Sequence, residues 1–100
     1  MPSKFFWVYM MTNQRHTVLY IGVTNNIERR ANEHRTHFNP KSFTAQYNVE
    51  KLVWYEPYTD LMAARLRERQ LKKWNRDWKE RLINEINPEW RDLAKSGMIG

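Results

Sequence analysis

The sequence contains no cysteine and no long hydrophobic run. Without cysteine the chain can form no disulfide, no thiolate zinc site and no cysteine nucleophile, and this composition fits a cytoplasmic protein. The apolar opening segment, Phe5 to Met11, is too short to span a membrane and lacks the small-residue cleavage region of a signal peptide. We therefore expect an unprocessed cytoplasmic protein without a membrane segment.

Several sequence motifs of catalysis are also missing. The chain has no glycine-rich phosphate loop, no serine-nucleophile motif and no paired-histidine zinc motif. It also has no internal repeat and no low-complexity segment, so its 100 residues predict one domain with one modest core. We assign residues 1–95 to this domain and residues 96–100 to a frayed tail.

Acidic residues are few relative to basic ones, 11 against 17, which gives a net charge of +6. Such an excess favours an anionic partner, with nucleic acid the leading candidate and an acidic membrane surface second. Leu61 to Leu82 carry eight lysines and arginines against three acids, so five of the six net charges lie there. A helix surface facing solvent explains this run as well as a nucleic-acid-binding face does.

The first half of the chain predicts a β-hairpin followed by a helix. Two aromatic and β-branched runs, Phe5–Met11 and Val18–Val23, flank a polar turn at Thr12–His16, a pattern typical of an antiparallel pair. With a four-residue loop from Asn13 to His16, Tyr9 would lie opposite Tyr20.

The remaining elements follow from capping and stop signals. Asn25 and Glu28 form a capping-box pattern for the first helix, which should end before Asn39-Pro40. Beyond it we expect a loop at Pro40–Asn48 and a strand at Val49–Glu56 that is closed by Pro57. A second helix should be capped by Thr59 or Asp60 and run to about Lys73. A third helix should run from Asn75 to about Glu85, where Asn87-Pro88 stops it, and a final turn follows at Glu89–Leu93.

His34 is the first candidate for chemistry. It falls in the apolar stripe of the first helix, formed by Ile27, Ala31 and Phe38, and Arg30 lies on the edge of that stripe one turn earlier. A histidine in such a stripe is usually a satisfied core residue, and an arginine at its edge usually faces solvent. If both face the tyrosine-bearing side of the hairpin, then two phenols, a guanidinium and an imidazole surround one pocket, a set that suits a phosphodiester.

Glu68 is the second candidate, because its carboxylate occupies a partly buried arc of the helix that begins near Asp60. A buried carboxylate is costly unless it is paired or bound to a metal. Arg65, Lys72 or Arg30 could neutralise it, which is the commoner outcome. Alternatively, Glu68 holds a single hard cation such as Mg²⁺ together with waters and a phosphate.

The ordered set of residues resembles the GIY-YIG nuclease superfamily. Trp7-Val8-Tyr9, ten intervening residues and Tyr20-Ile21-Gly22 are similar to the signature that names this superfamily. The resemblance extends over nearly the whole chain, through Thr24–Arg30, His34, Ala64–Trp74 with Glu68, and Asn87–Leu93. The closing segment resembles a small stand-alone bacterial branch, related to the nuclease domain of the excision-repair endonuclease and to homing endonucleases.

This resemblance implies an α/β fold with a three-stranded antiparallel sheet flanked by helices. It also implies phosphodiester hydrolysis with one divalent metal, Mg²⁺ or Mn²⁺. Carried over by position, Tyr20 is the phenol that activates water, Glu68 the sole metal ligand and Arg30 the residue that holds the scissile phosphate. Tyr9 and His34 complete the hydrogen-bonding shell, and Asn87 matches a polar position that supports the site.

Two departures from the family pattern matter. Trp7 and Val8 replace the glycine and isoleucine of the first half of the signature. Val23 follows Gly22 where some relatives carry a polar or basic residue that helps the phosphate. These departures predict slow cleavage or a demand for a particular DNA structure.

We therefore expect a DNA endonuclease that selects branched, nicked or single-stranded structures and has low sequence specificity. Contacts with phosphates position a strand without reading its sequence, and we assign them to Arg65, Arg69, Lys72, Lys73 and Arg76. The alternatives are a nucleic-acid-binding module with an inactive nuclease site, and a purely structural basic protein.

Overall fold

The computed structural model describes residues 4–36, 41–42 and 46–94. Phe38, the Asn39-Pro40 stop and the tail at 96–100 lie outside these residues. The described elements are β1 (Phe6–Thr12), β2 (Leu19–Thr24), α1 (Ile27–Arg35), β3 (Lys51–Tyr58), α3 (Leu61–Lys73) and α4 (Arg76–Ile86).

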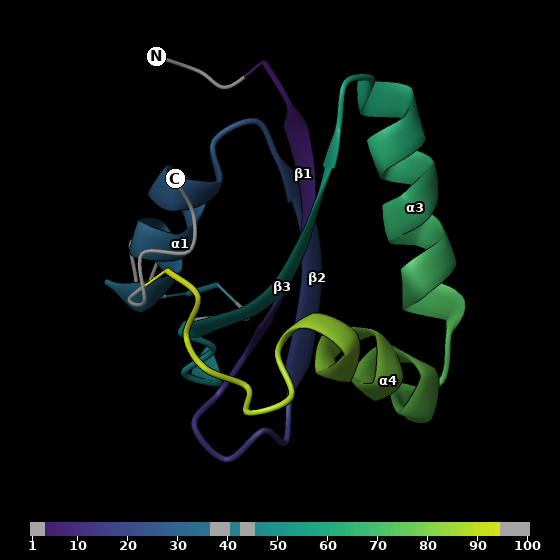
Figure 1. Cartoon of the computed structure of the whole chain (residues 1–100). Coiled ribbons are helices and arrows are strands. Elements are labelled where there is room, and N and C mark those ends of the chain that lie inside the picture. The colour runs from purple at the N-terminus through teal and green to yellow at the C-terminus, as the bar shows by residue number, and fades with distance from the viewer. Residues whose placement is uncertain (1–3, 37–40, 43–45, 95–100) are drawn as a thin grey trace.

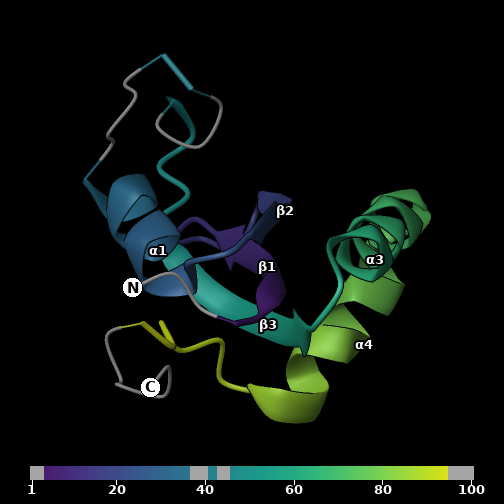
Figure 2. The ribbon, with the colours of Figure 1, turned by 90° about the horizontal axis from the view of Figure 1, so that it is seen from above.

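The three strands form one antiparallel sheet in the order β2-β1-β3. Helix α1 lies on one side of the sheet, and α3 and α4 lie on the other (Figure 1; Figure 2 shows the same layers from above). The predicted fold class, an antiparallel three-stranded sheet flanked by helices, is confirmed. None of the helices in the described part of the chain combines the length and the apolar character that crossing a membrane requires.

Alternation along β1 divides the core between the two faces of the sheet. Val8 and Met10 are buried on the face that α3 and α4 cover, where they join Ala64, Leu71 and Ile83. Tyr9 and Met11 point to the opposite face and pack in a second cluster whose members include Ile27, Leu52 and Leu93. The central strand is therefore buried on both sides, which fixes the position of Tyr9.

The predicted register of the hairpin is wrong by two residues. Tyr9 pairs with Gly22, and Tyr20 pairs with Met11. The cause is Asn13, whose Oδ1 accepts hydrogen bonds from the backbone N–H groups of Thr17 (2.9 Å) and Val18 (3.1 Å) and so lengthens the loop. A shift of two residues keeps every side chain on its face. Tyr9 and Tyr20 therefore stay on the same face as diagonal neighbours and not directly opposite each other, with ring centroids 6.2 Å apart.

Strand β3 begins two residues later than predicted and continues past Pro57, which pairs with Trp7 of β1. Proline does not end this strand because β3 is at the edge of the sheet, where a missing N–H group is tolerated. On the outer side of β3, the N–H of Leu93 donates to the carbonyl oxygen of Leu52 at 2.8 Å. The N–H of Leu52 in turn donates to Oδ1 of Asp92 at 3.3 Å. The segment after α4 is thereby attached along β3.

The helix starts follow capping chemistry. Asp60, one of the two predicted candidates, is the N-cap of α3 and accepts a hydrogen bond from the backbone N–H of Ala63 at 3.0 Å. Asn75 caps α4 in the same way, through the N–H of Trp78 at 3.1 Å. The predicted cap of α1 is wrong by one residue, because Asn26 and not Asn25 accepts from the N–H of Arg29, at 3.1 Å.

Candidate active site

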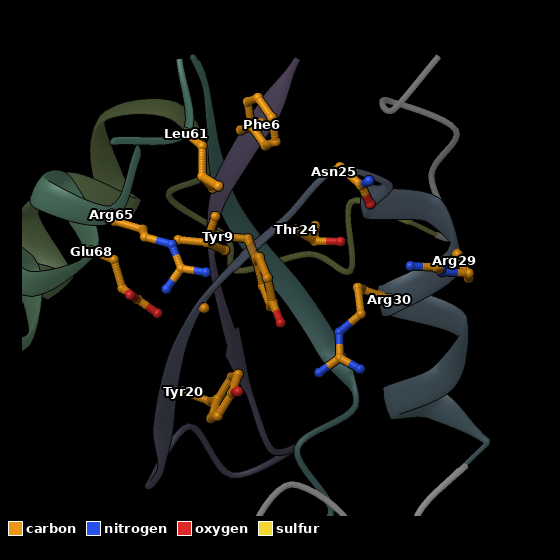
Figure 3. A pocket seen from close by; sticks show the side chains of 12 residues that line it. Phe6, Tyr9, Tyr20, Thr24, Asn25, Arg29, Arg30, Leu61, Arg65 and Glu68 are labelled. Atoms are coloured by element: carbon orange, nitrogen blue, oxygen red, sulfur yellow. The ribbon is translucent and has the colours of Figure 1, made fainter. Parts of the chain in front are cut away.

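An open pocket of about 410 Å³ lies where the hairpin, the start of α1 and α3 come together (Figure 3). Four of the six predicted catalytic residues line it: Tyr9 and Tyr20 from the hairpin, Arg30 from α1 and Glu68 from α3. Three of these side chains come from the consecutive elements β1, β2 and α1, and Glu68 comes from α3, which is distant in sequence. The structure thus brings together the phenols, the guanidinium and the carboxylate.

The pocket forms around β2, an edge strand of the sheet. The two tyrosines belong to the face that α1 covers, whereas α3 packs on the other face. Leu61, Arg65 and Glu68 form one side of α3, since residues three and four apart are neighbours on a helix, and all three line the pocket. Groups from opposite faces of the sheet therefore meet beside an edge strand.

Gly22 allows the phenol of Tyr9 to reach this pocket. A Cβ atom at Gly22 would lie 2.5 Å from Oη and 2.7 Å from Cζ of Tyr9, much closer than a van der Waals contact. The ring of Tyr9 therefore lies directly over the backbone of β2, in the space that a side chain at this position would fill. This close approach gives a physical reason for the glycine in the second half of the signature.

Behind the pocket, His34 contacts both Tyr9 and Arg30. Its Nε2 lies 3.2 Å from Oη of Tyr9 and 3.4 Å from Nη2 of Arg30. Burial of the ring, which is 4% exposed, together with the charge of Arg30 lowers the pKa of His34 to about 4. The imidazole is therefore neutral at pH 7. Because a guanidinium can only donate, Nε2 of His34 is an acceptor and the ring proton resides on Nδ1.

The two phenols have different environments. Tyr9 is only 1% exposed, and burial, followed by the proximity of Tyr20, raises its pKa to about 12. Tyr9 therefore stays protonated at neutral pH and is unsuited to act as a base. Tyr20 is less buried, and its ring lies 5.4 Å from that of His34. Of the two phenols, Tyr20 is the one that a water molecule in the pocket can approach more freely.

Arg30 and Glu68 face each other across the pocket from α1 and α3 (Figure 3). The guanidinium of Arg30 forms an ion pair with Glu33, with Nη1 and Oε1 2.9 Å apart. The side chain of Glu68 is 21% exposed and pairs with Lys72, with Oε2 and Nζ 3.4 Å apart. Of the neutralising partners considered for Glu68, Lys72 is the one that the structure provides.

The donor set around Glu68 is compatible with one hard cation. No group of three or more histidine, cysteine, aspartate or glutamate side chains is gathered for a metal anywhere in the described ranges. Mg²⁺ commonly binds through one or two carboxylates and completes its shell with water and phosphate oxygens. A single accessible carboxylate in an open pocket fits this mode of binding, and it does not fit a closed, all-protein site.

Asn87 lies away from the pocket. It is the C-cap of α4 and 5% exposed, and its Nδ2 donates to the carbonyl oxygens of Val53 (3.1 Å) and Arg91 (2.9 Å). Its Oδ1 accepts from the N–H of Arg91 at 3.0 Å. These contacts hold the segment after α4 against β3, so any support that Asn87 gives to the site is indirect. The sequence pattern does not reveal these partners.

The predicted nucleic-acid-binding residues separate into three groups. Arg65 lines the pocket, and Arg69 and Lys73 are exposed on α3, as is Lys72 beside Glu68. Arg76 is different, because its guanidinium donates to the carbonyl oxygens of His16 and of Thr17 (3.1 Å) and pairs with Glu80 (2.7 Å). Arg76 therefore ties α4 to the hairpin loop, a contact between distant segments that the charge pattern does not reveal.

Three further polar residues line the pocket although the sequence-based predictions do not assign them to the site: Thr24, Asn25 and Arg29. All three stand at the junction of β2 and α1. The signal that points to them is their position between Gly22 and Arg30, because a short β–α connection beside a site contributes its own side chains to that site.

The sequence of the chain is similar to those of known proteins. Residues 5–81 match the GIY-YIG catalytic domain. A UPF0213 protein of Syntrophus aciditrophicus is 37% identical over 83 residues, which is 83% of this chain and 93% of that protein. A UPF0213 protein of Natronomonas pharaonis is 38% identical over 77 residues, 77% of this chain and 88% of that protein.

The fold is also similar to a solved structure. The solution NMR structure of a UPF0213 protein from Bacillus halodurans superposes with a TM-score of 0.56 at 21% identity, over 91% of this chain and 95% of that one. At this identity the likeness bears on the fold alone. The sequence matches show the family: this chain belongs to the GIY-YIG family and is a relative of the UPF0213 proteins.

Proposed function

We propose that this protein is a divalent-metal-dependent endonuclease that hydrolyses phosphodiester bonds in DNA. The observation that carries the proposal is the lining of one open pocket by Tyr9, Tyr20, Arg30 and Glu68. The membership of the GIY-YIG family and the net charge of +6 support an anionic polymer as the substrate.

Glu68 is the residue that would hold the metal ion, Mg²⁺ or Mn²⁺. When bound, such an ion supplies positive charge that stabilises the phosphate and the leaving oxygen. The carboxylate keeps part of its surface accessible, and its partner Lys72 is on the exposed side of α3. Lys72 can therefore turn toward solvent when a cation takes its place.

The remaining residues of the pocket act on the phosphate and on water. Arg30 binds a non-bridging oxygen of the scissile phosphate, while its ion pair with Glu33 and its contact with neutral His34 hold the guanidinium in place. Tyr9 remains a protonated phenol and supports the same arrangement. Tyr20 orients the water whose oxygen attacks phosphorus, and its phenol passes the proton of that water on to solvent. The bond between phosphorus and the leaving oxygen then breaks, and the leaving oxygen takes a proton from solvent.

The binding surface continues along α3. Arg65, Arg69, Lys72 and Lys73 supply the charge that guides the backbone, and contacts of this kind do not distinguish one sequence from another. We therefore propose low sequence specificity and selectivity for branched, nicked or single-stranded DNA. We also place the protein in the cytoplasm, with a role in DNA repair, within the stand-alone branch related to the nuclease domain of the excision-repair endonuclease.

The test is a nicking assay on supercoiled and branched DNA with Mg²⁺ or Mn²⁺. We expect cleavage by the wild-type protein and a loss of at least about a hundredfold in Glu68→Gln, which keeps the size of the side chain and removes its charge. Glu89→Gln is the matched control, since Glu89 is an exposed acid paired with Arg91 outside the pocket. Undiminished cleavage by Glu68→Gln would contradict the assignment of the site.

A nucleic-acid-binding module with an inactive site is the second candidate. It is favoured by Val23, an apolar side chain in the wall of the pocket that offers no hydrogen bond to a phosphate. Tight binding of DNA without cleavage, for every divalent metal and DNA structure tried, would establish this alternative.

A further inference from the structure

Arg65 presents an unpaired positive charge on the α3 side of the pocket. Figure 3 shows its guanidinium extending from α3 toward Tyr9, while that of Arg30 enters from α1 on the other side of the same ring. Among residues 4–36, 41–42 and 46–94, the structure gives Arg65 no ion pair and no hydrogen bond through its side chain. The nearest candidate on its own helix, Glu68, pairs with Lys72.

The other charges around the pocket cancel in pairs. Arg30 is balanced by Glu33, and Glu68 is balanced by Lys72. Two cations that line the pocket are left over, Arg65 on α3 and Arg29 on α1, and the described chain contains no ion pair for either of them. A surplus of two positive charges on opposite walls exceeds what a single phosphodiester, with one negative charge, would neutralise.

The position of Arg65 along α3 indicates what it binds. Arg65 precedes Glu68 by three residues, so the two side chains are neighbours on the helix surface, with Cβ atoms roughly 5–6 Å apart. This spacing leaves room for an anion held by Arg65 to lie next to the phosphate at Glu68 and Arg30. Guanidinium groups bind phosphate oxygens with strong, charge-assisted hydrogen bonds.

We propose that Arg65 binds the phosphate adjacent to the scissile one, so that the pocket accepts a strand with at least two consecutive phosphates and discriminates against an isolated phosphodiester. The proposal rests on the proposed nuclease function for the identity of the scissile phosphate. The contact itself requires only that a nucleic acid strand occupies the pocket, and it can be measured without cleavage.

The first experiment measures binding of a labelled single-stranded oligonucleotide in EDTA at several salt concentrations. Arg65→Ala should weaken binding about tenfold and reduce the slope of log Kd against log salt by about 0.7, the value for one phosphate contact on a single strand. Arg15→Ala, which removes one exposed charge from the hairpin loop, should change the affinity by less than about twofold. Arg65→Lys should recover the slope and only part of the affinity, because the charge returns without the planar fork.

The second experiment asks whether Arg65 recognises a second phosphate. NMR titrations compare a thymidine dinucleotide, which has one phosphate, with the trinucleotide, which has two. The wild-type protein should gain about tenfold in affinity from the added phosphate, and Arg65→Ala should gain almost nothing. Equal gains in the two proteins, or an unchanged salt slope in Arg65→Ala, would overturn the proposal.

These outcomes are separable from the fate of the nuclease proposal, because no metal is present in either experiment. A protein that never cuts DNA but shows the Arg65-dependent gain would have the second phosphate subsite without the enzymatic activity. A protein that cuts DNA but shows no such gain would be a nuclease without this subsite. Thermal unfolding of each variant confirms that the fold is retained.

Discussion

Replacing Gly22 by alanine tests the close approach between β2 and the phenol of Tyr9. The added Cβ would lie 2.5 Å from Oη, 2.7 Å from Cζ and 3.0 Å from Cε1 of Tyr9. Ordinary contacts between such atoms begin near 3.4 Å, so the ring must move by roughly an ångström. Tyr9 is 1% exposed and hydrogen-bonded to His34, so this movement disturbs the packing of the ring and its contact with His34.

Two opposing effects set the size of the change in the free energy of unfolding. Overfilling a packed core costs about 1–3 kcal/mol. Alanine also restricts the unfolded chain, which stabilises the folded state by about 0.4–1 kcal/mol where the backbone conformation is compatible. We therefore expect Gly22→Ala to lower the free energy of unfolding by about 1–2 kcal/mol, equivalent to a decrease in Tm of roughly 5–10 °C for a domain of this size.

Urea denaturation followed by tryptophan fluorescence measures this change, and a double-mutant cycle identifies its cause. In a Tyr9→Leu background the phenol is absent, so alanine at position 22 should cost nothing or should stabilise the protein. The reasoning is refuted if Gly22→Ala is as stable as the wild type, or if it costs the same in both backgrounds.

Three further predictions follow from buried or bridging groups. His34 stays neutral in the folded protein down to its pKa of about 4, whereas in the unfolded chain it takes up a proton near its ordinary pKa of 6.5. Its contribution to stability is therefore present above pH 6.5 and is lost as the pH falls toward 4. Between pH 7 and 4.5 the free energy of unfolding should fall by about 2.5 kcal/mol more in the wild type than in His34→Gln, and equal losses in urea titrations would exclude His34 as the cause. Asn87→Leu should lower the free energy of unfolding by about 2–4 kcal/mol, because it leaves the buried carbonyl group of Val53 and the partly buried backbone groups of Arg91 without their partner. A stable variant in the same denaturation assay would contradict this. Arg76→Ala should lower the free energy of unfolding by about 1–2 kcal/mol, because it releases the hairpin loop from α4, and it should leave the salt slope of DNA binding unchanged. Lys73→Ala should instead lower that slope by about 0.7 and leave stability unchanged. A reversed pattern would make Arg76 the phosphate contact.

The sequence predicts those parts of the fold that depend on local chemistry. Asp60 and the start of the helix at Asn75 are predictable because a capping side chain bonds to backbone groups two or three residues away. The strands are predictable from their aromatic and β-branched runs. The register of the hairpin is not, because the loop length depends on which N–H groups the side chain of Asn13 selects.

The sequence likewise predicts only part of the candidate site. Alternation along the hairpin predicts that Tyr9 and Tyr20 share a face even when the register shifts by two. Periodicity cannot bring Glu68 to these tyrosines, since α3 packs on the opposite face of the sheet and its side chains reach the pocket beside the edge strand β2. The family resemblance supplies that pairing, and the structure supplies its geometry. For Asn87 neither source predicts the partners, which are backbone atoms of distant segments.

The segment that follows α4 has a consequence for solubility. A bare strand at the side of a sheet offers a row of backbone donors and acceptors to any passing chain, and such rows promote self-association. Here Leu93 and Asp92 occupy part of that row on β3, and Pro57 removes one of its donors. Shortening the chain before Asn87 would strip this cover, so loss of the last dozen or so residues should first appear as aggregation. The opposite side of the sheet, along β2, has the pocket beside it, and a bound polyanion would shield that side in turn.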